Sequence, residues 1–335
     1  MSGHMIGMSV RNEPPRLSPA HIDRQACSGD KEPIVVVKHI HPAMPSSAAA
    51  CYPITFASPI LSMIPTPVMS PFEICILAII QGLTEFLPVS SSGHLVVANA
   101  VLESLGHPPT EDLVEVNIVL HLGTLLAILV HYRREVFRML RSDWHVAACI
   151  VIGTIPAAVL GVLIKKGLPD ELQARVLENV LLAGCMFPIT AALLWFATRH
   201  KDGESDYPQL SFGTAFGIGV AQAMALLPGI SRSGSTIAAG LLTGLRRESA
   251  ATFAFLLAIP AIAGAGVLEG IDMLEAESST TPAVTLLLGF VVSFLVGWGA
   301  LLLLIRFVRQ GKLSLFSYYL LPLGIVVVAW QLWFS

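Results

Sequence analysis

The sequence is poor in charged residues. Asp, Glu, Lys and Arg make up 13% of the 335 residues, whereas about a quarter of an ordinary soluble domain is charged. Hydrophobic residues make up 54%, and the mean hydropathy is +0.72. This balance excludes a single soluble core. Because 27 Gly and 22 Pro are spread through long apolar runs, the sequence predicts a bundle of transmembrane helices, in which both residues are common.

The sequence also has no excess of basic residues and no paired cysteines. It carries 20 Lys and Arg against 23 Asp and Glu, so nothing is available to neutralise a nucleic-acid backbone, and we expect no nucleic-acid partner. The five cysteines are Cys27, Cys51, Cys75, Cys149 and Cys185. They are far apart and show no CxxC spacing, which argues against a zinc site and against a disulfide framework.

Residues 1–68 have no apolar run of the roughly 20 residues that span a bilayer. They carry five of the basic residues and ten prolines. We expect a disordered extension or a misassigned start codon, with Met63 or Met69 as the true first residue; a regulatory extension has no motif to support it. The functional unit is therefore expected to be a membrane domain over 69–335.

Beyond this tail the apolar segments fall into two length classes. Six are long enough to cross a membrane, namely 113–132, 144–164, 176–198, 251–269, 283–305 and 315–334. Four are short and form two pairs broken by Pro, Gly and Ser, namely 72–87 with 94–103 and 211–227 with 235–245. Irregular backbone at membrane depth is tolerated only where protein buries it or where it lines a wet cavity. The short pairs therefore predict two re-entrant helical hairpins.

The broken tips of the two hairpins resemble each other. One reads Leu87-Pro-Val-Ser-Ser-Ser-Gly93 and the other Leu227-Pro-Gly-Ile-Ser-Arg-Ser-Gly234, and a glutamine precedes each, Gln81 and Gln222. A string that recurs inside two unusual segment pairs predicts an internal repeat. The fold class we predict is an all-α integral membrane protein with repeats over about 69–198 and 211–335, about six transmembrane helices and two re-entrant hairpins.

The loops indicate how the bundle is oriented. Eleven basic residues fall in loops on one side and three on the other if the segments alternate. The eleven are Arg133, Arg134, Arg138, Arg141, Arg199, Lys201, Arg246, Arg247, Arg306, Arg309 and Lys312, and the three are Lys165, Lys166 and Arg175. Basic loops stay in the cytoplasm. The first hairpin then enters from outside and the second from inside, so the repeats are inverted.

Three charged or titratable residues lie at the hairpin tips, where they are costly and thus mark function. Glu85 precedes the first tip, His94 follows it, and Arg232 lies in the second tip. A serine-rich turn at the start of a helix presents backbone N–H groups that can bind an anion, and an arginine can donate two parallel hydrogen bonds to a phosphate. If the tips meet, they form a phosphate or diphosphate site. Ser91 and His94 would supply a nucleophile and its base, and Glu85 would hold a divalent cation or activate the nucleophile.

Structural interpretations stay open beside these. The serines of both turns can satisfy freed backbone groups, and Arg232 can form a buried ion pair with Glu85. His121, inside an apolar segment before Thr124, can be a packed residue or a functional one. A transporter or flippase for an anionic solute is the alternative function, since inverted repeats with broken helices are a transporter architecture.

Two long motifs resemble the signatures of bacterial undecaprenyl-diphosphatases, the membrane enzymes associated with bacitracin resistance. They are Gln81-Gly-Leu-Thr-Glu-Phe-Leu-Pro-Val-Ser-Ser-Ser-Gly-His94 and Leu227-Pro-Gly-Ile-Ser-Arg-Ser-Gly-Ser-Thr236. The resemblance runs from about Met69 to the C-terminus. It implies a plasma-membrane hydrolase that removes the terminal phosphate of undecaprenyl diphosphate and returns undecaprenyl phosphate to peptidoglycan synthesis. It also implies Mg²⁺ or Ca²⁺ as cofactor, with Glu85 as ligand, and is compatible with a homodimer.

The resemblance assigns the site residues by position. The catalytic residues it implies are Glu85, Ser91, His94 and Arg232. The substrate-binding residues that we predict are Gln81, Ser90, Ser92, Ser231, Ser233 and Thr236. Gln81 stands where the family pattern also has an acid, which weakens any mechanism that needs two carboxylates. The pocket is expected to open to the outer, periplasmic face.

Overall fold

The structure is a computed structural model, and it describes residues 70–105, 113–200, 202–275 and 281–334. The expectations for residues 1–68 lie outside this part of the chain. The described residues form α-helices, one 3-10 turn at Tyr207–Gln209 and an isolated bridge between Ser205 and Leu245. The prediction of an all-helical membrane protein is confirmed.

The long helices match the predicted spans. They are α3 (Leu113–His131), α5 (Trp144–Gly167), α7 (Val180–Arg199), α10 (Arg247–Glu275), α11 (Ala283–Arg309) and α12 (Leu315–Phe334). Five of them are long and apolar enough to cross a membrane alone. The sixth, α3, bends by 74° into α4 (Arg133–Arg141), and the bent pair counts as one further span.

Several helix boundaries differ from the prediction by a few residues. Helix α7 begins at Val180 instead of residue 176, because the short helix α6 (Asp170–Leu177) ends before it. The side chain of Asn179 caps the new start by accepting from the Leu182 N–H at 2.8 Å. Helix α10 extends beyond the predicted 251–269 at both ends.

Both short pairs form helical hairpins. The first is α1 (Pro71–Phe86) with α2 (Ser91–Ser104), and the second is α8 (Phe212–Met224) with α9 (Arg232–Leu242). Ser70 and Glu73 form a capping box at the start of α1, and Ser211 caps α8 by accepting from the Thr214 N–H. Helix α1 ends at Phe86, and Leu87 is extended, since proline disfavours helical backbone in the residue that precedes it; α8 ends at Met224, four residues before Pro228.

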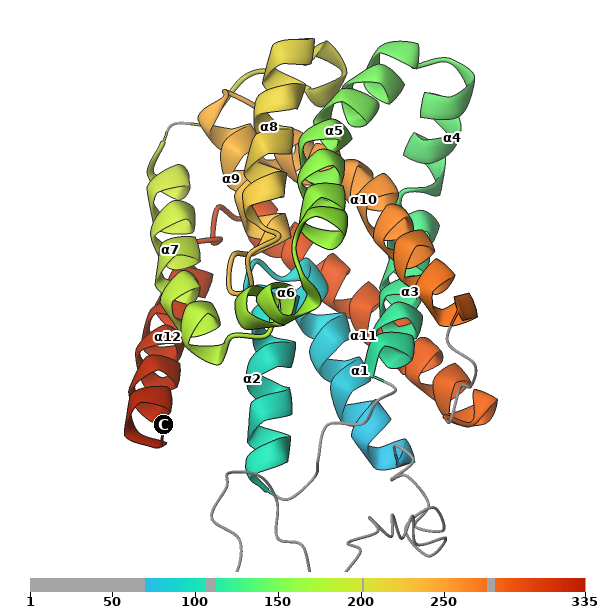
Figure 1. Cartoon of the computed structure of the whole chain (residues 1–335). Coiled ribbons are helices and arrows are strands. Elements are labelled where there is room, and N and C mark those ends of the chain that lie inside the picture. The colour runs from blue at the N-terminus through green and yellow to red at the C-terminus, as the bar shows by residue number, and fades with distance from the viewer. Residues whose placement is uncertain (1–69, 106–112, 201, 276–280, 335) are drawn as a thin grey trace, which may run out of the picture. The chain divides into compact units, whose positions relative to one another are not determined.

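The hairpins occupy opposite ends of the bundle, and their turns meet between them (Figure 1). Helix α1 packs along α11, α8 packs along α5, and α7 packs along α12. The contacts of α1 and α8 rely on glycine: a methyl group on Gly82 would lie 2.9 Å from the backbone nitrogen of Gly297, and one on Gly219 would collide with Gly153. Each hairpin therefore lies against a helix from the other half of the sequence.

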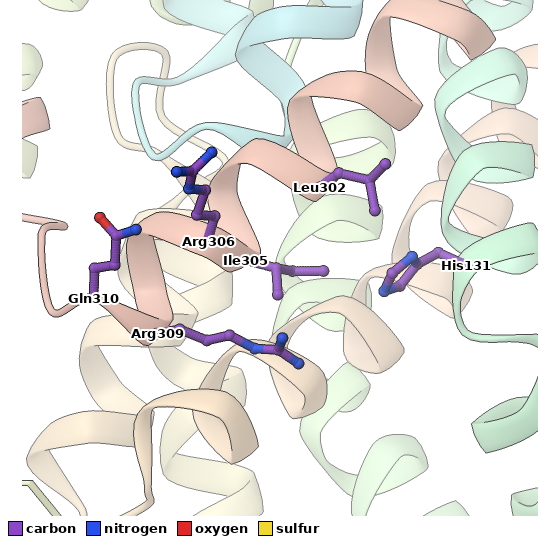
Figure 2. A pocket seen from close by; sticks show the side chains of 6 residues that line it. All are labelled: His131, Leu302, Ile305, Arg306, Arg309 and Gln310. Atoms are coloured by element: carbon purple, nitrogen blue, oxygen red, sulfur yellow. The ribbon is translucent and has the colours of Figure 1, made fainter.

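The ends of α3, α7, α9 and α11 lie together. Arg247 Nε forms an ion pair with Asp202 at 2.6 Å, and Arg309 Nε pairs with Glu248 at 3.0 Å. A cavity of about 450 Å³ lies between the ends of α3 and α11 (Figure 2). It is lined by His131, Leu302, Ile305, Arg306, Arg309 and Gln310. These are the ends that carry the basic loops, so the structure groups the loops that the charge count placed on one side.

Candidate active site

The two hairpin turns are in direct contact. The Gly229 N–H of the second turn donates to Ser90 Oγ at 3.1 Å, and Ser233 Oγ donates to the Leu87 carbonyl at 3.3 Å. A methyl group on Gly93 would lie only 2.8 Å from the Cα of Gly229. The structure thus brings together the two motifs that the sequence singled out.

Serines cap the second helix of each hairpin in equivalent ways. Ser90 Oγ accepts from the Gly93 N–H at 3.3 Å, and Ser231 Oγ accepts from the Gly234 N–H at 3.0 Å. The hydroxyls of Ser90 and Ser92 lie 3.3 Å apart, and those of Ser231 and Ser233 lie 3.2 Å apart. Ser90 and Ser231 therefore fill the structural role left open for these serines, and Ser233 fills it through the Leu87 carbonyl, whereas Ser92 contacts only the Ser90 hydroxyl among the described residues. Their role in substrate binding stays a prediction.

Ser90 adopts a backbone conformation that side chains rarely take. Its φ is +73°, a value that costs about 1–3 kcal/mol in a residue other than glycine. The hydroxyl of this residue accepts from Gly93 of its own hairpin and from Gly229 of the other. These two bonds hold the strained turn, so the shape of the first tip depends on its contact with the second.

The first residues of α2 and α9, Ser91 and Arg232, both reach Glu85. Ser91 Oγ donates to Glu85 Oε2 at 2.7 Å, and Arg232 Nη2 donates to Glu85 Oε1 at 2.8 Å. The Glu85 side chain is 5% exposed and that of Arg232 is 18% exposed. The ion pair that the sequence left as an alternative is formed. N–H groups in the first turn of a helix lack an intrahelical acceptor and attract anions. The first turns of α2 and α9 converge beside the Glu85 carboxylate.

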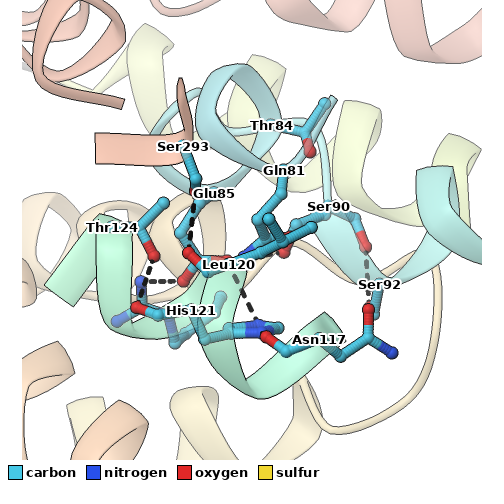
Figure 3. A network of polar contacts seen from close by, with 12 residues as sticks. Gln81, Thr84, Glu85, Ser90, Ser92, Asn117, Leu120, His121, Thr124 and Ser293 are labelled. Atoms are coloured by element: carbon cyan, nitrogen blue, oxygen red, sulfur yellow. Dashed lines mark hydrogen bonds and ion pairs between the residues drawn. The ribbon is translucent and has the colours of Figure 1, made fainter. Parts of the chain in front are cut away.

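Gln81 lies one helical turn before Glu85. Its Nε2 donates to Glu85 Oε2 at 3.1 Å, and its buried Oε1 has no hydrogen-bond partner among the described residues. Figure 3 shows the amide beside the carboxylate. At the second tip, Thr236 donates to the Arg232 carbonyl at 2.8 Å and thereby steadies the first turn of α9.

The structure does not pair His94 with Ser91. The hydroxyl of Ser91 donates to Glu85, whereas the His94 ring has Nδ1 2.8 Å from the Ser90 carbonyl oxygen and Nε2 2.8 Å from the Tyr319 hydroxyl. The ring also packs edge-on against Phe187 of α7. Ser91 faces back towards α1, while His94 faces α7 and α12. This geometry suits a residue that supports the turn better than a base for Ser91.

Sequence reasoning did not assign His121 to the site. Its Nε2 lies 3.9 Å from Glu85 Oε2, so α3 contributes a fourth side chain beside the carboxylate, after Ser91, Arg232 and Gln81 (Figure 3). The available signal was a titratable side chain inside an apolar helix. That signal does not tell which way the side chain faces, because α3 is apolar on all sides.

The side chains at the tips do not form a cation site by themselves. Glu85 is the single carboxylate there, and its oxygens already accept from Arg232, Ser91 and Gln81. Across the described residues no group of three His, Cys, Asp or Glu side chains is placed to hold a metal. Mg²⁺ and Ca²⁺ need several oxygen ligands. No step proposed below depends on a cation.

Comparison with known proteins places this site in a family. Residues 74–326 match the model of the bacitracin resistance protein BacA. Three relatives are described as undecaprenyl-diphosphatase. The one from Rhodopirellula baltica is 45% identical over 76% of this chain and 96% of the relative. Those from Carboxydothermus hydrogenoformans and Desulfosudis oleivorans are 38% and 41% identical, over 78% and 76% of this chain and 98% and 97% of the relatives.

The matched residues 74–326 include both hairpin tips, Glu85 and the four side chains around it, which are Gln81, Ser91, His121 and Arg232. The family match therefore covers the site and all of the membrane bundle except the first residues of α1 and the end of α12. The chain belongs to the bacitracin resistance protein family.

Proposed function

We propose that this protein is an undecaprenyl-diphosphatase, a multi-pass membrane hydrolase that removes the terminal phosphate of undecaprenyl diphosphate. The relatives that carry this name align over almost their full length. The observation that carries the proposal is the convergence of Glu85, Ser91 and Arg232 where the first turns of α2 and α9 meet. The product, undecaprenyl phosphate, would return to peptidoglycan synthesis and so confer resistance to bacitracin.

The diphosphate would bind at the paired helix starts. The unpaired N–H groups of the first turns and the guanidinium of Arg232 would bind the terminal phosphate. Arg232 would break its ion pair with Glu85 and donate to phosphate oxygens instead. Donors fixed in this way stabilise the charge that spreads over a transferred phosphoryl group. Ser91 lies against Glu85, so its hydroxyl would lie between the carboxylate and the bound phosphate. The isoprenoid tail would lie along the apolar outer faces of the helices.

The site would open to the outer face of the bacterial plasma membrane. Arg247, Arg306 and Arg309 lie at helix ends that gather on one side of the bundle, and basic ends stay in the cytoplasm. The first hairpin then enters from the periplasmic side. A homodimer and an Mg²⁺ or Ca²⁺ cofactor remain predictions from the resemblance.

The test is release of orthophosphate from undecaprenyl diphosphate by the purified protein in detergent. A transporter has no reason to hydrolyse its solute where no compartments exist, and the family match lends no support to that alternative. Arg232→Gln and Glu85→Gln should each lower kcat by about 10²–10³-fold, as loss of one charge-stabilising group does.

The matched control is Arg306→Gln. This arginine lines the cavity between the ends of α3 and α11 and shares no contact with the hairpin tips, so its loss should leave kcat unchanged. Wild-type phosphate release by Arg232→Gln would show that the site is assigned to the wrong residues.

A further inference from the structure

Two hydrogen-bond acceptors face each other beside the reacting groups. His121 Nδ1 lies 2.8 Å from the carbonyl oxygen of Asn117. A carbonyl only accepts, so in the neutral ring Nδ1 carries the hydrogen and Nε2 presents a lone pair. That lone pair faces Glu85 Oε2 at 3.9 Å, and an ionised carboxylate oxygen also only accepts.

The gap between these acceptors can be bridged by one water molecule that lies beside the line joining the two atoms. A distance of 3.9 Å is too long for a hydrogen bond between the two atoms. A water oxygen about 2.8 Å from each would span it, with an angle of about 90° at the water. Water brings two O–H donors, one for each acceptor. The His121 side chain is 34% exposed, whereas Glu85 is 5% exposed, so the gap can be filled from the His121 side.

Hydrogen bonds hold both acceptors in place. Ser91, Gln81 and Arg232 hold the Glu85 carboxylate from three directions. The turn of α3 that carries His121 is held in two places: Thr124 Oγ1 donates to the His121 carbonyl at 2.9 Å, and Ser293 Oγ of α11 donates to the Leu120 carbonyl at 2.7 Å. Figure 3 shows both bonds. A water in this gap would therefore be positioned before substrate binds.

We propose that His121 Nε2 and Glu85 Oε2 together hold the water that attacks the terminal phosphorus. This inference rests on the proposed phosphatase function. The water oxygen forms a bond to phosphorus while the bond from phosphorus to the bridging oxygen breaks. The electron pair of that bond leaves with the lipid monophosphate, and the water proton passes to Glu85. His121 acts as a hydrogen-bond acceptor that orients the water, and Ser91 orients the carboxylate.

The test compares His121→Leu, which cannot accept a hydrogen bond, with His121→Gln, which accepts through its amide oxygen. His121→Leu should lower kcat by about 10–100-fold, because a misplaced reactant loses up to about 10²-fold, with KM within twofold of wild type. His121→Gln should recover most of that loss. His131→Leu, ten residues along the same helix and outside the hairpin tips, should behave as wild type.

Thermal unfolding of each variant shows whether it folds, and His121→Ala replaces His121→Leu if the latter does not. A folded His121→Leu with wild-type kcat overturns the inference. So does a folded His121→Gln that is as slow as His121→Leu, since a purely structural role needs no acceptor. Failure of the wild-type protein to release phosphate would instead refute the proposed function.

Discussion

Gly93→Ala should separate the two hairpin tips and thereby slow catalysis. The added methyl carbon would lie 2.8 Å from the Cα and N of Gly229 and from a ring carbon of Phe187. Carbon atoms prefer separations of at least about 3.5 Å. The turns must therefore move apart by roughly 0.7 Å, since two of the three neighbours are backbone atoms and the third belongs to a buried ring.

The size of the effect follows from that displacement. The bond from the Gly229 N–H to Ser90 Oγ, now 3.1 Å, would lengthen to about 3.8 Å and be lost. Overpacking and the lost bond should lower the free energy of unfolding by roughly 2–4 kcal/mol. Arg232 is three residues from Gly229 and would shift with it relative to Glu85. A displacement near 1 Å costs up to about 10²-fold in rate, so we expect kcat to fall by roughly that factor.

Phosphate release and unfolding in mixed detergent micelles measure the two effects. Gly161→Ala in α5 is the matched control, because nothing lies within 4 Å of its added methyl and alanine is favoured over glycine within a helix by up to about 1 kcal/mol. If Gly93→Ala equalled Gly161→Ala in both kcat and stability, close contact between the turns would not be needed for the site.

Two further variants test the first tip. Tyr319→Phe removes the hydroxyl that lies 2.8 Å from His94 Nε2, and should lower the free energy of unfolding by about 0.5–1.5 kcal/mol. It should lower kcat much less than Glu85→Gln does. If the two variants lowered kcat equally, His94 would have a part in the reaction after all. Ser90→Gly should be more stable than Ser90→Ala by about 1 kcal/mol in equilibrium unfolding, because both lose the hydroxyl and glycine alone relieves the positive φ. The reverse order would show that the turn is not strained.

The local features of the hairpins were predictable from sequence. Pro88 and Pro228 interrupt apolar runs that are too short to cross a membrane, so the positions of both tips could be read directly. Glu85 and Arg232 stood out because charge at that depth is costly. Their mutual contact followed once the tips were taken to meet.

Contacts between distant helices were not predictable. The spacing of Ser91 and His94 predicted a nucleophile with its base, yet the two side chains face different helices. His121 reaches Glu85 only because α3 is rotated to face α1, and an apolar helix carries no pattern that fixes this rotation. The bend after His131 and the break before Val180 likewise depend on tertiary packing.

The division of the site between the two hairpins has a consequence for biosynthesis. Glu85 and Arg232 are 147 residues apart in the chain. At about 5–20 residues per second, the ribosome adds the arginine roughly 7–30 s after the glutamate. During that interval the nascent first hairpin carries a carboxylate without its counter-ion, at a cost of a few kcal/mol if it enters the bilayer charged. Stable insertion of the first hairpin is thus coupled to translation of the second. A chain truncated before Arg232 would leave Glu85 without its counter-ion, as a target for membrane quality control.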